Sequence, residues 1–255
     1  MATNRSGAED PARTLALLWG TTTTAGRRGP RPALSTAQVA MAAIELADAE
    51  GVEAVTMRRV AQVLGLSPMA LYTYVPGKAE LLDLMVDTVY ARMPRSMPAD
   101  DGWRARAAAV ADDNRALCRA HPWMAAVSTS RPPLGPGLMA KYEYELQALD
   151  STGLDDVELN AALTHLLGFV QTFARMAADE RAVQQDSAMS DKQWWAGNAE
   201  LLARVFDPER YPTAARVGAA AGEAHSGAYS PARAYEFGLG RVLDGLAALI
   251  EKRTH

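Results

Sequence analysis

One segment, residues 56–78, constrains the fold more than any other, because it carries the start, turn and restart of two short helices. Thr56 can cap the first helix, since its hydroxyl accepts hydrogen bonds from free N–H groups of the first turn. Gly65 supplies the turn. Ser67 followed by Pro68 is a second helix start, with a capping hydroxyl before a proline that needs no N–H. The pattern predicts a helix-turn-helix.

The predicted second helix, Pro68 to Tyr74, has one main aliphatic anchor, Leu71. Its other side chains are free to face outward, and a helix exposed in this way fits the major groove of DNA. The outward-facing residues are Met69, Ala70, Thr73 and Tyr74.

Two arginines, Arg58 and Arg59, lie in the first turn of the first helix, where the positive end of the helix dipole disfavours cations. A phosphate would resolve this conflict, because helix N-termini point N–H groups at anions. The alternative is a solvated surface pair. No acidic residue occurs between Thr56 and Lys78 in a chain of net charge −4, which favours the phosphate.

The chain from Leu34 to Met93 resembles the TetR (tetracycline repressor) family of bacterial transcription factors. Residues 34–51 are similar to the family's first helix, with Val39, Ala43, Ile44 and Ala47 toward the core. The family's helix-turn-helix pattern is met at Thr56, Arg58, Ala61, Gly65, Tyr72 and Lys78.

The resemblance implies a role in DNA binding for each matching residue. Thr56, Tyr72 and Lys78 match positions that contact phosphates, and Arg58 matches an arginine that can reach a guanine. The positions that face base edges are Pro68, Met69, Ala70, Thr73 and Tyr74, with Arg59 and Ser67 beside them. Because this face is unusually apolar, we expect specificity to depend on Arg58, on thymine-methyl contacts and on DNA shape.

A basic stretch precedes the first helix. Arg27, Arg28 and Arg31 alternate with glycine and proline, which disfavour helix and favour an extended arm. Such an arm can lie in a narrow minor groove, where the potential is most negative. The alternative is a disordered basic linker.

With 255 residues, 49% of them hydrophobic, the chain is long enough for a DNA-binding unit and a larger second core. No apolar run approaches the roughly 20 residues of a membrane span, and no signal peptide is recognisable, so we expect a cytoplasmic protein with no membrane partner. A single cysteine, Cys118, fits a reducing compartment. Residues 1–33 are predicted to be a flexible extension, with a short helical turn within residues 11–20.

Residues 94–255 are predicted to form a helical effector-binding and dimerisation domain, which makes the whole chain all-α. The expected helices are 103–120, 138–150, 155–181, 190–206 and 231–252, with short turns at 122–128. Residues 207–230 are expected to be a long connection.

Two apolar stripes are candidates for a subunit interface: Leu163, Leu166, Leu167, Val170 and Phe173, and Phe237, Leu239, Val242, Leu246 and Ile250. The alternative is that both stripes pack within one subunit. Proteins of the TetR type pair corresponding helices into a four-helix dimer bundle, so the resemblance implies a homodimer. The two recognition helices of such a dimer, about 34–36 Å apart, would bind successive major grooves of a pseudo-palindromic DNA site.

A small organic effector needs a mostly apolar pocket with a few polar groups. Candidate lining residues are Trp103, Trp123, Met139, Tyr142, His165, Phe169, Phe173 and Trp194, with Gln171 as a further polar candidate. The alternative is that they only form the core. Four residues before Arg131, where the tetracycline repressor has a metal-coordinating histidine, this chain has Val127, so no metal or other cofactor is expected.

The sequence therefore predicts a ligand-responsive repressor that binds a double-stranded DNA operator as a dimer. Repression rather than activation rests on the resemblance alone. A constitutive dimeric DNA-binding protein is the alternative. An enzyme is disfavoured, because the sequence contains no phosphate loop, no GxSxG elbow and no HExxH motif.

Overall fold

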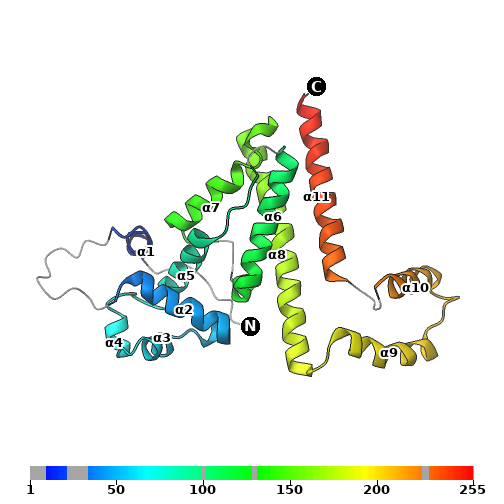
Figure 1. Ribbon diagram of the computed structural model, residues 1–255, viewed down its shortest axis with the longest axis horizontal. Coiled ribbons are helices and arrows are strands. Elements are labelled where there is room, and N and C mark those ends of the chain that lie inside the picture. Colours follow the sequence, from blue (N-terminus) through cyan, green and yellow to red (C-terminus); the bar gives the residue numbers. More distant parts are fainter. Residues whose placement is uncertain (1–9, 22–33, 99–101, 128–130, 226–229, 255) are drawn as a thin grey trace, which may run out of the picture.

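The computed structural model describes residues 10–21, 34–98, 102–127, 131–225 and 230–254, and these contain helices and no strand (Figure 1). This confirms the all-α prediction. Among the same residues, no helix is both long and apolar enough to cross a membrane.

The first compact unit, the head, consists of helices α2 to α5. Ser35 caps α2 in a reciprocal arrangement with Gln38, and Gly51 ends the helix at φ +84°, a conformation that suits glycine. The four core positions predicted in this helix are almost fully buried. The elements of the head are α2 (Thr36–Glu50), the short η1 (Val52–Ala54), α3 (Met57–Val63), α4 (Pro68–Leu71) and α5 (Lys78–Arg92).

The helix-turn-helix forms at the predicted residues. The Thr56 hydroxyl accepts from the Arg59 N–H at 3.1 Å, and the Ser67 hydroxyl accepts from the Ala70 N–H at 3.2 Å. Gly65 has φ +67°, which a residue with a Cβ rarely adopts. Leu71 is fully buried, so α4 is held to the head by its predicted anchor.

Helix α4 is shorter than predicted, because it ends at Leu71 rather than at Tyr74. The Thr73 hydroxyl donates to the Ala70 carbonyl at 2.6 Å, and the Tyr74 N–H bonds instead to Leu71, which tightens the chain into a turn. Pro76 then disfavours a helical conformation at the residue before it.

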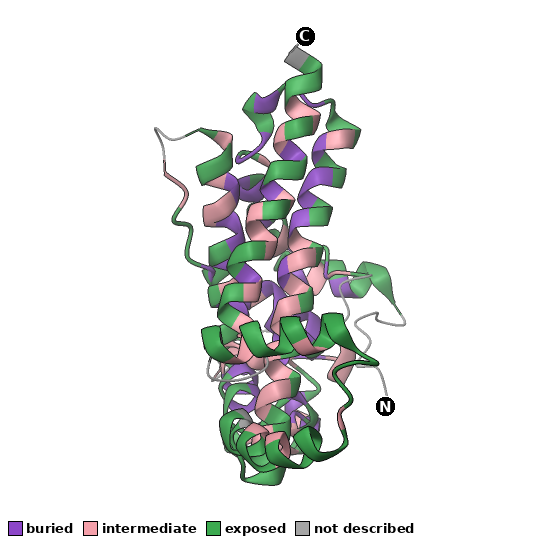
Figure 2. Cartoon of the chain, turned by 90° about the vertical axis from the view of Figure 1, so that its right-hand side faces the viewer, coloured by how far each residue is buried: buried purple, intermediate pink, exposed green. Residues whose placement is uncertain are grey.

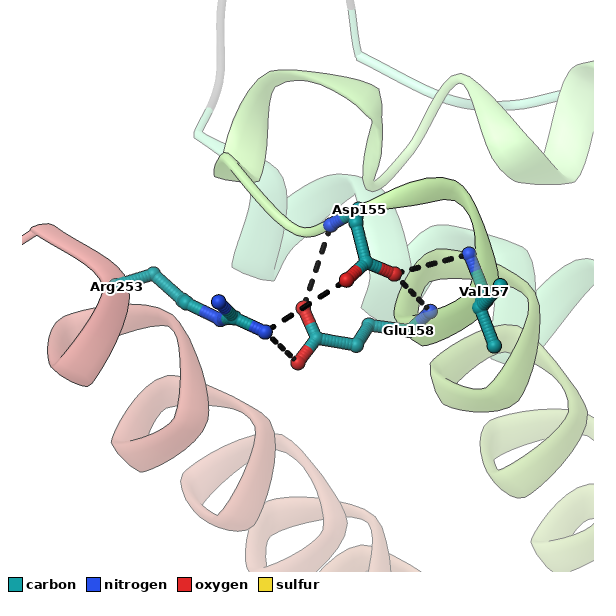
Figure 3. Close-up of polar contacts among 4 residues, drawn as sticks. All are labelled: Asp155, Val157, Glu158 and Arg253. Carbon is teal, nitrogen blue, oxygen red and sulfur yellow. Dashed lines mark hydrogen bonds and ion pairs between the residues drawn. The ribbon is translucent and has the colours of Figure 1, made fainter.

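The second unit, the body, is a bundle in which α8 and α11 run antiparallel (Figure 1). Asp155 and Glu158 form a capping box at the start of α8, and Arg253 near the end of α11 pairs with both carboxylates (Figure 3). The two helices are thus joined at this end by charge as well as by packing. The elements are α6 (Trp103–Ala120), η2 (Pro122–Ala126), α7 (Pro136–Leu146), η3 (Asp150–Thr152), α8 (Asp156–Ser187) and α11 (Pro231–Thr254).

Helices α9 (Asp191–Val205) and α10 (Pro212–His225) form an arm that lies apart from the bundle (Figure 1). None of their described side chains is buried, as their exposed and intermediate colours show (Figure 2). The expectation of a long connection over residues 207–230 was wrong. The segment is rich in alanine, the best helix former, and its proline at the first helical position costs no hydrogen bond.

Part of the N-terminal extension is helical, at the place where a short helical turn is predicted, and the helix is longer than one turn. Helix α1 (Pro11–Leu18) begins at Asp10, whose carboxylate accepts two backbone N–H groups, and packs against α5. Leu18 is buried, and the Trp19 indole donates to the Leu134 carbonyl at 2.9 Å. The helix therefore touches both the head and the body.

Helices α5 and α7 pack closely. The Asp87 carboxylate on α5 accepts the N–H groups of Gly137 and Leu138, at 3.1 and 2.8 Å, at the start of α7. A Cβ at Gly137 would lie 2.0 Å from the Asp87 carbonyl oxygen, and one at Gly135 would lie 2.4 Å from its carboxylate. Glycine at both positions allows the two helices to meet.

We predict that Gly137→Ala destabilises the protein by about 1–3 kcal/mol, because the added methyl group meets backbone that cannot move aside. The measurement is urea denaturation followed by circular dichroism. Gly218→Ala on α10 is the matched control. No atom lies within 4 Å of a Cβ there, and alanine favours the helix, so its stability should equal or exceed the wild type. Equal stability of Gly137→Ala and the wild type would contradict the prediction.

Candidate nucleic-acid interface and ligand cavities

The helix-turn-helix presents an exposed face. The Met69 side chain is 76% exposed, so its thioether can reach a molecule that binds this face. Tyr72 is 43% exposed, and Thr73 is exposed beside it. Among the predicted contact residues, Thr56, Arg58, Ser67 and Pro68 are also exposed, whereas Arg59, Ala70, Tyr74 and Lys78 are half-buried.

The two neighbouring arginines of α3 differ. Arg59 pairs with Glu50 at 2.8 Å and donates to the Gln62 amide oxygen at 3.3 Å. Arg58 is exposed and makes no hydrogen bond or ion pair with any described residue. Arg59 therefore needs no external anion, because Glu50 approaches from the end of α2. For Arg58, which has no such partner among the described residues, an external anion stays a prediction.

A second cation lies at a helix N-terminus. Lys78 is the first residue of α5, whose cap, Gly77, offers no side-chain acceptor. The free N–H groups of this turn and the lysine ammonium favour an anion, with Glu80 as the acidic group of the same turn. The predicted arm residues Arg27, Arg28 and Arg31 lie outside the described residues.

The body contains a cavity of about 430 Å³, here cavity 1, between α5, α6, α7 and α8. At its centre the Lys141 ammonium pairs with the Glu145 carboxylate at 2.5 Å, and the Asn114 amide donates to the same oxygen at 2.6 Å. Lys141 also lies 5.2 Å from the ring centre of Tyr90 on α5. The cavity is thus lined by mixed apolar and hydrogen-bonding groups.

Lys141 and Glu145 are only 6% and 1% exposed, so their charges are compensated by each other rather than by water. Burial, followed by the Glu145 charge, raises the pKa of Tyr90 well above its usual range. The Tyr90 hydroxyl therefore stays protonated near neutral pH and can donate to a bound molecule.

Three of the predicted ligand residues line two separate cavities. Tyr142 and Gln171 line cavity 1. Phe173 lines a different cavity, cavity 2, between α6, α8 and α11. The other six line neither of these two cavities, and their role in effector binding stays a prediction; they are Trp103, Trp123, Met139, His165, Phe169 and Trp194.

Trp123 is buried at the junction of head and body instead. Its indole donates to Asp48 on α2 at 2.8 Å, and the His121 ring nitrogen lies 2.9 Å from the same carboxylate. These contacts join α2 to the segment after α6, so the tryptophan fixes the two units against each other.

The others face solvent or pack in the core. His165 is exposed on α8, Met139 is 39% exposed, and Trp194 is 54% exposed on the arm. Trp103 packs against the core, and the Phe169 ring fills the space over Gly238 on α11. Helical periodicity identified these side chains as apolar or aromatic but not the neighbour that each one meets.

The sequence reading missed the polar centre of cavity 1, Lys141 and Glu145. A lysine and a glutamate four residues apart are typical of a solvated helix face, so nothing local marks them as buried. In the sequence, only the apolar character of the surrounding helices indicates that Lys141 and Glu145 are buried.

The predicted interface stripes pack mainly within the subunit. Leu163, Leu166, Val170 and Leu246 are buried in the body. A Cβ at Gly238 would lie 2.6 Å from the Phe169 ring, so this glycine allows α11 to approach α8 within one chain.

The large apolar side chains left exposed on α8 and α11 are Val157, Met176, Val183 and Phe237, with exposed fractions of 78%, 45%, 62% and 68%. Of these, Phe237 belongs to the predicted stripe of α11, and the other three lie outside the predicted stripe of α8. On the arm, the corresponding residues are Trp194, Leu201, Leu202, Val205 and Val217.

No group of three or more His, Cys, Asp or Glu side chains among the described residues is arranged to hold a metal ion. Val127, at the position where the resemblance would require a histidine ligand, is buried among apolar residues.

One buried carboxylate on α5, that of Asp83, has an unsatisfied oxygen. Asp83 is 3% exposed, and its Oδ1 atom accepts no hydrogen bond from any described residue. Burial, followed by the nearby Glu80 charge, raises the pKa of Asp83 to about 6. The folded protein therefore holds this proton more tightly than the unfolded chain does.

Comparison with known proteins agrees with this architecture. Residues 41–85 match the bacterial regulatory proteins of the tetR family, and residues 95–250 match the tetracyclin repressor-like C-terminal domain. The chain is 41% identical to the HTH-type transcriptional repressor DrrR1 of Streptomyces coeruleorubidus, over 99% of this chain and 91% of that protein.

Solved structures give the same result. Apo ActR from Streptomyces coelicolor superimposes with a TM-score of 0.70 at 26% identity, over 87% of this chain and 99% of that one. ActR in complex with actinorhodin gives 0.71 at 26% identity, over 86% and 97% of the two chains.

We predict that Asp83→Asn stabilises the protein near pH 7.5 but not near pH 4. A raised carboxyl pKa makes stability fall as the pH rises from about 4 to about 6, and the loss persists above that range. The amide removes this loss, so the gain at pH 7.5 should be about 1–3 kcal/mol, an upper range set by the pKa shift. Urea denaturation at both pH values measures it, with the exposed Asp186→Asn as control. A gain of the same size at both pH values would exclude titration of Asp83 as the cause.

Proposed function

The chain belongs to the TetR family of bacterial regulatory proteins, and on that premise we propose that it is a dimeric repressor released from its operator by a small organic effector. The membership confirms the resemblance inferred from residues 34–93. Proteins of this family are DNA-binding regulators, so the chain is not an enzyme. We place the protein in the cytoplasm, where the operator lies.

The main support for a role in DNA binding is that the Arg58 guanidinium is free to contact another molecule. This guanidinium is exposed and unpaired at the start of α3, while its neighbour Arg59 is paired. We assign Arg58 to a guanine contact and Lys78, at the start of α5, to a phosphate. Thr56, Ser67 and Tyr72 would contact the backbone, and the exposed Met69 would meet a base edge with Pro68, Ala70, Thr73 and Tyr74 beside it.

The dimer that we propose uses the exposed faces of α8 and α11 rather than their buried stripes. Val157, Ala161, His165, Gly168, Thr172, Met176 and Val183 recur at intervals of three, four or seven residues along α8 and are all exposed. Phe237 is the exposed aromatic group of α11. The small side chains at Ala161 and Gly168 allow α8 of a second subunit to approach closely. The arm offers further apolar surface to the same subunit.

Cavity 1 is the proposed effector site. Its volume falls in the range of small-molecule pockets, and it combines apolar walls with a few polar groups. The similar protein ActR has been solved with actinorhodin bound. A cavity of this kind favours an effector-responsive regulator over a constitutive DNA-binding protein.

The connection between cavity 1 and DNA runs through α5. Tyr90 on this helix lines the cavity, Asp87 caps α7, and Lys78 lies at the other end. An effector that fits one placement of α5 against α7 better than another shifts the population toward that placement. Coupling of about 1–3 kcal/mol, typical of such systems, is sufficient for regulation.

We predict that Arg58→Ala reduces discrimination between operator and scrambled DNA by about tenfold or more, because a bidentate arginine–guanine contact is worth about 1–3 kcal/mol. The operator is first selected from a random pool by the wild-type protein. Fluorescence anisotropy at several salt concentrations then gives both affinities.

Arg59→Ala is the matched control. It should change the affinities for operator and scrambled DNA by a similar factor, because the Arg59 guanidinium is paired with Glu50. Equal discrimination by Arg58→Ala and the wild type would remove the base contact from the proposal. A wild-type protein with no salt-sensitive affinity for any duplex would end the proposal as a whole.

A second prediction concerns assembly. Phe237→Asp should convert the dimer to monomers, because a carboxylate in an apolar interface is strongly unfavourable. Light scattering after gel filtration measures the mass. Leu15→Asp, at a 39% exposed position on α1, should leave the dimer intact. A Phe237→Asp variant that remains dimeric would show that α11 does not form the interface.

A further inference from the structure

Cavity 2 is a separate space of about 320 Å³ between α6, α8 and α11. It shares only Cys118 with cavity 1, and no residue of α5 or α7 lines it. Its location is therefore distinct from the effector site proposed above.

Three guanidinium groups line cavity 2: Arg115 and Arg119 from α6, and Arg181 from α8. Within the described part of the chain, none of them forms an ion pair. The Arg181 Nε group donates to the Ala177 carbonyl at 3.0 Å, and the Arg115 guanidinium lies 3.9 Å from the ring centre of Tyr235. The terminal nitrogens of all three remain available, so the cavity carries positive charge that no described side chain neutralises by a direct contact.

The Tyr235 hydroxyl is the second observation. Tyr235 lines cavity 2 and is only 2% exposed, yet its oxygen has no hydrogen-bond partner among the residues that the structure describes. Burial is the main cause that raises the pKa of Tyr235 to about 12, and the charges acting on it are Asp112, Arg115, Arg119 and Cys118. Three of these four groups line the same cavity. A buried hydroxyl without a partner is unfavourable, and an acceptor placed in the cavity would satisfy it.

The remaining lining is flat and apolar. The Phe173 and Tyr235 rings lie edge to face, with ring centres 5.6 Å apart, and small side chains, Ala174, Ala177 and Ala232, fill little of the space beside them. An aromatic ring can pack against these surfaces, and guanidinium groups stack on aromatic faces as well as pairing with carboxylates.

We propose that cavity 2 binds a small aromatic carboxylate, with the acid group held by Arg115, Arg119 and the Tyr235 hydroxyl and the ring packed on Phe173. Arg181 supplies further positive charge at the α8 wall. The site does not depend on DNA binding or on an effector in cavity 1, so its test is separate from that of the proposed function.

The test uses the full-length protein without DNA and two probes of nearly equal shape, 1-hydroxy-2-naphthoate and its neutral amide. Isothermal titration calorimetry should give a dissociation constant for the carboxylate at least tenfold lower than for the amide. Arg115→Gln should weaken carboxylate binding by about tenfold and abolish most of the preference over the amide.

Tyr235→Phe separates a binding role from a structural one. Because the hydroxyl has no partner in the protein, its removal should leave the melting temperature without probe unchanged or raise it, while carboxylate binding weakens severalfold. Thr164→Val, a change of similar volume in cavity 1, should leave carboxylate binding unchanged.

Four results would overturn the proposal. The first two are absence of any carboxylate binding and equal affinities for the two probes. The third is carboxylate binding that is lost in Thr164→Val but not in Arg115→Gln. The fourth is a Tyr235→Phe variant that melts several degrees lower yet binds the carboxylate as the wild type does.

Discussion

The placement of the head on the body depends on one buried carboxylate. Asp87 accepts the first free N–H groups of α7, and its backbone and side chain occupy the space that side chains at residues 135 and 137 would need. A carboxylate at a helix N-terminus is favourable both as a hydrogen-bond acceptor and as a negative charge at the positive end of the dipole. Because the contact is only possible with glycine on α7, the two helices can meet at this distance in few other ways.

A second carboxylate, that of Asp48 on α2, also joins the head to the body. It accepts a hydrogen bond from the Trp123 indole and lies beside the His121 ring. Helix α1 adds a third contact through the Trp19 indole. These polar contacts add to an apolar junction, because the buried side chains Val86, Val89 and Met93 belong to the same hydrophobic core as those of the body. The polar contacts are directional, which restricts the angle at which α5 and α7 can meet.

Cavity 1 lies against this junction, and its polar centre is on α7. The buried Lys141–Glu145 pair is satisfied within the protein, because the two residues pair on α7 and Asn114 of α6 donates to the same Glu145 oxygen. Cavity 2 lies between α6, α8 and α11, and it is lined by Arg115, Arg119 and Arg181, which form no ion pair with any described residue. The two cavities share one helix but present different chemistry, which makes them suited to different molecules.

The sequence by itself determined the local structure. Thr56, Gly65 and Ser67 fixed the helix-turn-helix because capping and positive φ depend on the residue and its immediate neighbours, and the family pattern followed from the same residues. Tertiary structure alone decided the partners: Arg59 with Glu50, Trp123 with Asp48, and Lys141 buried with Glu145. Periodicity tells which side of a helix is apolar, but not whether another helix of the chain or a second subunit covers it. For that reason the sequence leaves open whether the stripes on α8 and α11 pack inside the subunit or against a second one, and the tertiary structure buries Leu163, Leu166, Val170 and Leu246 within the chain.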